Sequence, residues 1–247
     1  MDALRMENDV ITTRINSDIL LSEYKKGIRF GTDALLLSHF CGKGKRGCDL
    51  GSGSGVVSLL LLSLGKAQKM TGIELAEEYA SLSRLNAENN GFADTFECIG
   101  CDVKDIKEHV EAGSMDIVVT NPPYLPSSSG KKNEDRLKYT AFHETTSTID
   151  EFVASAGYIL KYGGSFFCVY RPEYISKLIC AMEANSISLK RLRYVSPSVG
   201  KPPCLVLVEG KKNGRPGAKT EPTLYLYSDA SHTRFTDETE EIYRSFG

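Results

Sequence analysis

The feature that most constrains the fold is a regular alternation of apolar, strand-like runs with amphipathic helical segments, from Lys45 to Ala184. The pattern predicts strands that end at Leu50 or span residues 69–73, 96–99, 115–119 and 165–170, and helices at 55–64, 76–90, 103–111, 149–160 and 173–184. Because parallel strands need crossover connections, usually helices, alternation of this length predicts an α/β fold with a doubly wound, mostly parallel sheet. Ligands of such sheets bind at the carboxyl ends of the strands.

The two ends of the chain predict smaller elements. Short apolar runs before residue 30 predict a β element, at 10–13, 19–21 and 28–30 with a turn at 25–27. Thr32 is expected to cap a helix over residues 33–40. Residues 189–195 and 204–209 predict an antiparallel hairpin at the edge of the sheet. A chain of 247 residues fits one domain, 1–247, with a core at 45–247 preceded by an N-terminal segment at 1–44.

Composition excludes several classes of protein. A hydrophobic content of 41% and a charged content of 25% are ordinary for a soluble globular protein. The longest apolar stretch, residues 56–64, is broken by Ser58 and Ser63, so no membrane span is expected. The first residues lack the layout of a signal peptide, and we expect a cytoplasmic protein. The seven cysteines are scattered, so neither a metal site nor a full disulfide framework is expected.

A glycine-rich turn follows the first strand of the alternation, in the sequence Asp49-Leu50-Gly51-Ser52-Gly53-Ser54-Gly55. Glycine lets the backbone approach a ligand closely because it has no Cβ and tolerates positive φ. The dinucleotide fingerprint would place its third glycine at Val56. The turn therefore favours a nucleoside ligand without pyrophosphate, such as S-adenosylmethionine, although such turns also serve as plain strand–helix connections.

Two carboxylates follow the next strands. Glu74 ends the second strand, where an acid can accept both hydrogen bonds of a ribose diol. Asp102 follows the third strand, where it could accept a hydrogen bond from an adenine amino group or cap the next helix. Both positions are consistent with a nucleoside ligand.

The most specific motif is Asn121-Pro122-Pro123-Tyr124, directly after the apolar run 117–119. An exocyclic amino group is a poor nucleophile because its lone pair is delocalised. The Asn121 side-chain oxygen and the Pro122 carbonyl can each accept one N–H and turn that lone pair towards a methyl donor. The prolines stiffen the turn, and Tyr124 offers a face for stacking. The motif predicts methyl transfer to an amide or aromatic amino nitrogen.

Basic residues are concentrated late in the chain. Between Ser186 and Thr220 there are eight basic residues and one acid, Glu209. Such a stripe can contact phosphates or can be a solvated hairpin edge. We expect RNA contacts at Lys131, Lys132, Arg136, His143, Arg171, Lys190, Arg193, Lys211 and Lys212.

The chain resembles the bacterial class I methyltransferases that N6-methylate the anticodon-loop adenine of a valine tRNA. The shared segments are Phe30 to Leu37, Asp49 to Gly55, Gly72-Ile73-Glu74, Asn121 to Tyr124, His143-Glu144, Val169 to Glu173 and the basic hairpin ending at Glu209. The resemblance implies a Rossmann-like fold, S-adenosylmethionine as cofactor and tRNA as substrate. It also implies that Phe30, Thr32 and Asp33, in the N-terminal segment, close over the cofactor. We expect the protein to be a monomer.

One departure from the family concerns the substrate. The family often has Arg-His-Glu where this chain has Phe142-His143-Glu144, which puts the identity of the substrate in doubt.

Two alternatives to this function stay open. A protein-glutamine N5-methyltransferase uses the same tetrapeptide, but such enzymes carry a sizeable helical N-terminal domain. The second alternative is a cofactor-binding RNA chaperone or assembly factor without catalysis, against which the intact Asn121 argues.

Overall fold

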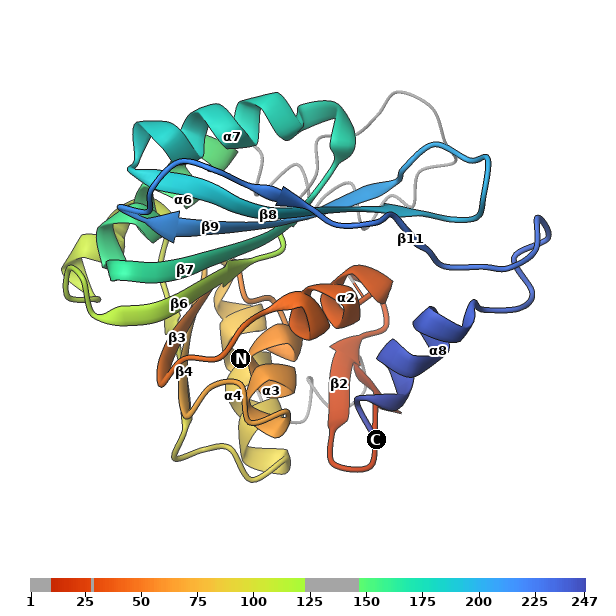
Figure 1. Ribbon diagram of the computed structural model, residues 1–247. Helices are drawn as coiled ribbons and strands as arrows, with labels where there is room; N and C mark the ends of the chain where they lie inside the picture. The colour runs from red at the N-terminus through yellow and green to blue at the C-terminus, as the bar shows by residue number, and fades with distance from the viewer. Residues whose placement is uncertain (1–9, 28, 123–146) are drawn as a thin grey trace.

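The computed structural model describes residues 10–27, 29–122 and 147–247 (Figure 1). Its main sheet has the strand order β10-β8-β9-β7-β6-β3-β4-β5, with β11 also paired to β8. These strands are β3 (Arg46–Leu50), β4 (Lys69–Glu74), β5 (Phe96–Gly100), β6 (Met115–Thr120), β7 (Leu160–Tyr170), β8 (Ile187–Ser196), β9 (Leu205–Lys212), β10 (Lys219–Thr220) and β11 (Leu224–Tyr225). A separate antiparallel hairpin consists of β1 (Val10–Arg14) and β2 (Leu20–Tyr24).

The direction of the strands confirms the expected α/β fold. Strands β7, β6, β3, β4 and β5 are parallel neighbours in that order. The expected hairpin is present as β8 and β9, and β9 runs antiparallel to both β7 and β8. The structure adds two short strands, β10 and β11, which cover the outer side of β8. The outer edge of the sheet therefore consists of β10 and β11 in addition to the β8–β9 hairpin.

Helices cover both faces of the sheet. They are α2 (Thr32–Phe40), α3 (Val56–Ser63), α4 (Glu77–Asn89), η1 (Val103–Glu108), α6 (Ile149–Ile159), η2 (Pro172–Tyr174), α7 (Ile175–Ala184) and α8 (Asp237–Arg244). One buried cluster joins α2 and α3 to one face, and a second joins η1, α6 and α7 to the other. Figure 1 shows α7 across the sheet from α2 and α3.

Strand β6 shows why the central strands carry continuous apolar runs. Ile117 and Val119 face the cluster with α2 and α3, whereas Val118 faces the cluster with α6 and α7. All three side chains are buried. A strand covered on both faces needs apolar residues at successive positions, and this run delivers the chain to Asn121.

The start of α2 differs from expectation. The capping residue is Gly31, whose backbone is extended, and Thr32 is the first helical residue. The Thr32 hydroxyl lies 3.2 Å from the hydroxyl of Tyr243 and caps nothing. The prediction of Thr32 as N-cap is therefore wrong. The predicted β segment at 28–30 is also absent at Arg29 and Phe30, and Ile28 lies outside the described residues.

The C-terminal region of the chain, for which no pattern predicts structure, returns to the N-terminal segment. Helix α8 lies beside α2 and β2 (Figure 1). Ile242 and Phe246 are buried in the same cluster as Ile19, which precedes β2, and Leu21, which lies in β2. Among the described helices, none is long and apolar enough to cross a membrane.

Candidate active site at the carboxyl edge of the sheet

Four neighbouring strands bring the chemistry-bearing residues to one edge. In the order β6, β3, β4, β5, their carboxyl ends carry Asn121, the glycine-rich turn, Glu74 and Asp102. The register pairs Leu50 of β3 with both Thr120 of β6 and Ile73 of β4. The structure thus unites four sequence motifs that lie up to about seventy residues apart, as parallel strand topology requires.

The glycine-rich turn has the conformation that its sequence predicts. Gly51, Gly53 and Gly55 have φ of 72°, 55° and 83°, which side-chain-bearing residues rarely adopt. The Gly51 N–H donates to the Ile73 carbonyl at 2.8 Å, which fixes the turn against β4. A Cβ placed on Gly53 would meet no atom within 4 Å, so its backbone borders open space. A ligand can therefore approach the chain at Gly53.

Glu74 ties this turn to the next helix. Its side chain is fully buried. One carboxylate oxygen accepts the Gly53 N–H at 2.8 Å, and the other accepts the Ala76 N–H at 3.0 Å. The carboxylate therefore orders the turn, which is a role that the motif alone does not reveal. Its contact with a ribose stays a prediction.

Asp49 is a buried carboxylate behind the turn. Only 2% of it is exposed, and Oδ2 accepts a hydrogen bond from Ser58 at 2.9 Å. Burial raises the pKa of Asp49 to about 7, and the charge of Glu74 adds to the shift although the Ser58 hydrogen bonds oppose it. Because burial disfavours the ionised form of Asp49, a cationic ligand bound nearby would stabilise its negative charge.

Asp102 caps η1, which is one of the two roles that the sequence predicts for it. Its carboxylate accepts hydrogen bonds from the Lys104 N–H at 3.1 Å and the Ser147 hydroxyl at 2.7 Å. Partial burial acts to raise the pKa of Asp102, but these hydrogen bonds together with the nearby Lys104 ammonium outweigh it and hold the pKa below its ordinary value. The side chain is thus an ionised acceptor, and its contact with adenine stays a prediction.

The Asn-Pro-Pro-Tyr turn begins beside the glycine-rich turn. The Thr120 hydroxyl donates to the Leu50 carbonyl at 2.8 Å, which joins the end of β6 to the end of β3. Asn121 is half-buried and Pro122 is buried. The remaining expected residues of this region lie outside the described residues: Pro123, Tyr124, Lys131, Lys132, Arg136 and His143.

The segment expected to close over the cofactor is held by residues that no motif named. The Phe30 N–H donates to the buried carboxylate of Glu23 at 2.6 Å. Burial raises the pKa of Glu23, although the Phe30 hydrogen bond and the charge of Arg29 oppose the shift. The Asp33 carboxylate accepts the Ala34 N–H at 3.0 Å. Glu23 could have been suspected because strand alternation places it on the same face as the apolar Leu21, whereas no local pattern marks Tyr243.

Part of the basic stripe is engaged within the protein. Lys190 donates to the carbonyls of Arg215 and Gly217, and Lys212 donates to the Asn185 carbonyl at 2.7 Å. Arg193 binds the Pro222 carbonyl and pairs with Glu238 at 2.5 Å. These contacts give Lys190, Arg193 and Lys212 structural roles in and around the hairpin.

The register also places much of the stripe away from Asn121. Lys211 of β9 pairs with Ser165, whereas Val206 pairs with Tyr170 at the carboxyl end of β7. Five residues of strand separate the two pairs, or about 17 Å. Lys211 and Lys212 therefore lie at the amino edge of the parallel strands, away from the edge that carries Asn121. Arg171 lies at the carboxyl edge and donates to the Cys204 carbonyl at 3.2 Å.

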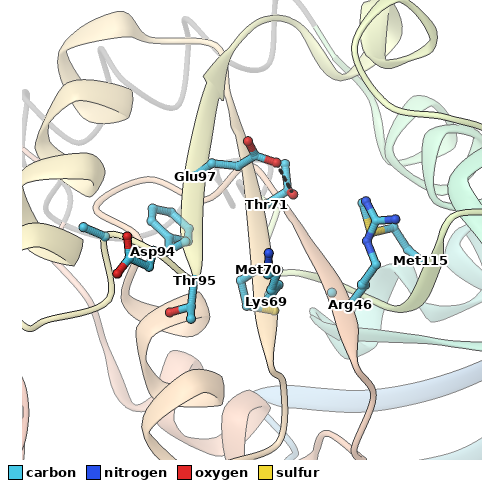
Figure 2. Close-up of a pocket in the computed structure, with 11 residues that line it drawn as sticks. Arg46, Lys69, Met70, Thr71, Asp94, Thr95, Glu97 and Met115 are labelled. Carbon is cyan, nitrogen blue, oxygen red and sulfur yellow. Dashed lines mark hydrogen bonds between the residues drawn. The ribbon is translucent and has the colours of Figure 1, made fainter.

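A cavity of about 220 Å³ also lies at the amino edge. Arg46, Lys69, Phe96 and Met115, which line it, are the first residues of β3, β4, β5 and β6. Figure 2 shows the Thr71 hydroxyl bonded to the Glu97 carboxylate within this lining, at 3.0 Å. This cavity is at the wrong end of the strands for a site built on the four motifs. The described residues also contain no group of three His, Cys, Asp or Glu side chains placed to hold a metal ion.

A family model described as the methyltransferase small domain matches residues 25–184, which include all four motifs at the carboxyl edge. The chain belongs to this methyltransferase family. The match begins in the Lys25-Lys26-Gly27 turn and so includes the segment around Phe30.

Curated relatives of this methyltransferase cover most of its length. It is 26% identical over 190 residues to the tRNA1(Val) (adenine(37)-N6)-methyltransferase of Porphyromonas gingivalis, with 74% of each chain covered. It is 27% identical over 228 residues to the protein of that name from Parabacteroides distasonis, with 90% of this chain and 92% of the relative covered.

Solved structures share the methyltransferase fold. A predicted O-methyltransferase from Agrobacterium tumefaciens has a TM-score of 0.70 at 20% identity, covering 87% of this chain and 97% of its own. The geranyl diphosphate C-methyltransferase of Streptomyces coelicolor, crystallised with S-adenosyl-L-homocysteine, has a TM-score of 0.51 at 12% identity, covering 73% and 76%. These likenesses show the fold alone.

Proposed function

We propose that this methyltransferase transfers a methyl group from S-adenosylmethionine to the exocyclic N6 amino group of an adenine in tRNA. The observation that carries the proposal is the meeting of Asn121-Pro122 with the glycine-rich turn on adjacent strands, β6 and β3. The names of the relatives, tRNA1(Val) (adenine(37)-N6)-methyltransferase, support the anticodon loop of a valine tRNA as the substrate.

The residues at the carboxyl edge fit the cofactor chemically. The open backbone at Gly53 would receive it, and Glu74 and Asp102 would accept hydrogen bonds from its ribose and adenine. The buried Asp49 favours the positive charge that S-adenosylmethionine carries. When bound, the cofactor supplies an electrophilic methyl group whose bond to sulfur breaks with the electron pair staying on sulfur.

Asn121 and Pro122 prepare the acceptor nitrogen. The side-chain oxygen of Asn121 accepts one N–H and the Pro122 carbonyl accepts the other, which turns the lone pair out of conjugation with the ring. Tyr124 stacks on the adenine. A strong base is unnecessary, because the methylated amino group is acidic and loses its proton to water. Residues 1–44 act as a cover over the cofactor and 45–247 as the catalytic core of one domain.

We place RNA contacts at the carboxyl edge. Arg171 follows β7 at this edge and contacts the β8–β9 loop, in which the exposed Lys201 lies. Charge reversal at Lys201 should weaken tRNA binding. It should also reduce, by about one, the steepness with which the logarithm of the binding constant falls with the logarithm of the salt concentration. Charge reversal at Lys211 is the matched control at the other edge, and an equal loss there would contradict this placement.

The test of the function is product identity. The protein is incubated with labelled S-adenosylmethionine and total tRNA from a strain that lacks it, and nucleosides are then separated. N6-methyladenosine in tRNA is the expected product. Label on a protein glutamine would establish the N5-methyltransferase alternative, and no label on any RNA would favour a non-catalytic RNA-binding role.

A further inference from the structure

Two side chains outside the motifs hold the segment Phe30–Thr32 at its two ends. The carboxylate of Glu23 accepts the Phe30 N–H at 2.6 Å, and the Tyr243 hydroxyl lies 3.2 Å from the Thr32 hydroxyl. We propose that Glu23 and Tyr243 are positioning residues that hold this segment over the bound S-adenosylmethionine. The inference rests on the proposed function, because it needs the cofactor at the carboxyl edge.

Glu23 is fixed because its strand is docked on α4 by two asparagines. Asn86 donates to the Ser22 carbonyl at 3.0 Å and accepts the Ser22 N–H at 2.9 Å. One helical turn later, Asn90 makes the same two bonds to Leu20, at 2.8 and 2.7 Å. The two side-chain amides thus take the place of a neighbouring strand along this side of β2. The carboxylate of Glu23 therefore has a defined position relative to α4.

Asn86 also joins this arrangement to the cofactor turn. Its side-chain N–H donates to the Ser54 carbonyl at 2.9 Å, and the residue is fully buried. One amide therefore binds both the glycine-rich turn and the residue before Glu23. A continuous set of hydrogen bonds runs from Ser54 through Asn86 and β2 to the Phe30 N–H. The position of the covering segment is thereby set relative to the turn that would hold the cofactor.

The loop before the covering segment passes close to the same helix. A Cβ on Gly27 would clash with the Tyr79 hydroxyl, so a larger residue there would require the Tyr79 side chain to shift. Tyr79 is in the first turn of α4, shortly after Glu74 and Ala76, and its ring packs edge-on against Tyr24 at 5.3 Å. Gly27 therefore lies against the side chain of a residue in the first turn of α4, the helix that follows the strand end where the ribose is proposed to bind.

Tyr243 is fixed by the packing of α8. Its ring stacks on Phe235 at 5.1 Å, and Phe235 stacks on Tyr227 at 5.0 Å. Glu238 of α8 pairs with Arg193, and Ser245 contacts the His39 ring at 3.1 Å. The ring of Tyr243 thus belongs to a supported stack, whereas its hydroxyl reaches Thr32. Removing only the hydroxyl separates the positioning role from the packing role.

The test measures cofactor affinity and turnover separately. In Tyr243→Phe we expect the Kd and KM for S-adenosylmethionine to rise about 3- to 10-fold, the range for one lost hydrogen bond. We expect kcat at saturating cofactor to stay within about 2-fold, and the Kd for tRNA to stay unchanged. Tyr225→Phe is the matched control, because its hydroxyl makes no hydrogen bond with the described residues.

Glu23 is tested by a conservative pair of variants. Glu23→Gln keeps an oxygen for the Phe30 N–H and should retain cofactor affinity within about 3-fold. Glu23→Leu removes the acceptor and should weaken affinity about 10-fold or more. If Glu23→Leu does not fold, the affinities of Tyr243→Phe and Glu23→Gln for S-adenosylmethionine test the inference instead.

Three outcomes would overturn the inference. The first is an unchanged Kd for S-adenosylmethionine in a folded Tyr243→Phe variant. The second is an equal loss of cofactor and tRNA affinity, which would indicate general destabilisation. The third is a wild-type protein that binds no S-adenosylmethionine; this result alone would also overturn the proposed function, so the two failures are distinguishable by the wild-type titration.

Discussion

The substitution Asp49→Asn should make the stability of this protein less dependent on pH. The Asp49 carboxyl has a pKa of about 7 in the folded protein, against an ordinary value of 3.8, chiefly because burial disfavours its charge. Between these values the folded protein holds a proton that the unfolded chain releases. Its free energy of unfolding therefore falls as the pH rises towards 7, and this loss is absent when Asn replaces Asp.

The size of the effect follows from the shift. One pKa unit corresponds to about 1.4 kcal/mol, so raising the pH from about 5 to about 8 should cost the wild type about 2–3 kcal/mol through Asp49 as an upper bound. The asparagine oxygen can still accept the Ser58 hydroxyl proton. Any cost of burying the new amide N–H groups is the same at both pH values and cancels in the comparison.

Urea unfolding of both proteins at about pH 5 and about pH 8 provides the assay. The stability of Asp49→Asn relative to the wild type should increase by about 2–3 kcal/mol from the lower to the higher pH. Ser58→Ala is a useful companion variant, because loss of its hydrogen bond should raise the pKa of Asp49 further. A stability difference between Asp49→Asn and the wild type that does not change with pH would refute the reasoning.

Three other variants test single contacts. Lys66→Met should lower the free energy of unfolding, measured in urea, by about 1–3 kcal/mol. The reason is that the Lys66 ammonium donates to three backbone carbonyls at the end of α2: Ser38 at 2.9 Å, His39 at 2.5 Å and Cys41 at 2.8 Å. Glu74→Gln should weaken S-adenosylmethionine binding about 10-fold or more in calorimetry, since it removes the charge and one acceptor; unchanged affinity would exclude Glu74 from the site. Arg191→Lys should destabilise the fold by about 1–2 kcal/mol without changing cofactor affinity, because the guanidinium lies 3.8 Å from the centre of the Phe40 ring.

The central sheet and its edge were predictable because local patterns determine them. The apolar run 117–119 is needed for a strand buried on both faces, and Asn121 must then fall at its carboxyl end. The positive φ values of the turn follow from Gly51, Gly53 and Gly55. Parallel pairing brings these motifs together without any further signal in the sequence.

The residues around the covering segment were not predictable in the same way. Thr32 and Tyr243 are 211 positions apart, and their contact depends on how α8 packs. The N-cap prediction for Thr32 failed because the extended Gly31 takes that position and the Thr32 hydroxyl meets Tyr243. A count of charges along the chain likewise could not show that Lys190 and Lys212 bind backbone carbonyls.

The most direct test of the account is the rate of methyl transfer by Asn121→Ala on tRNA under single-turnover conditions. The wild type and Asn89→Ala, an exposed asparagine on α4, serve as references. Loss of one acceptor for the N6 amino group should slow formation of N6-methyladenosine about 10²–10³-fold. The Kd for S-adenosylmethionine and the midpoint of urea unfolding should stay near wild-type values. A near-normal rate in Asn121→Ala would contradict the assignment of this residue and the mechanism built on it.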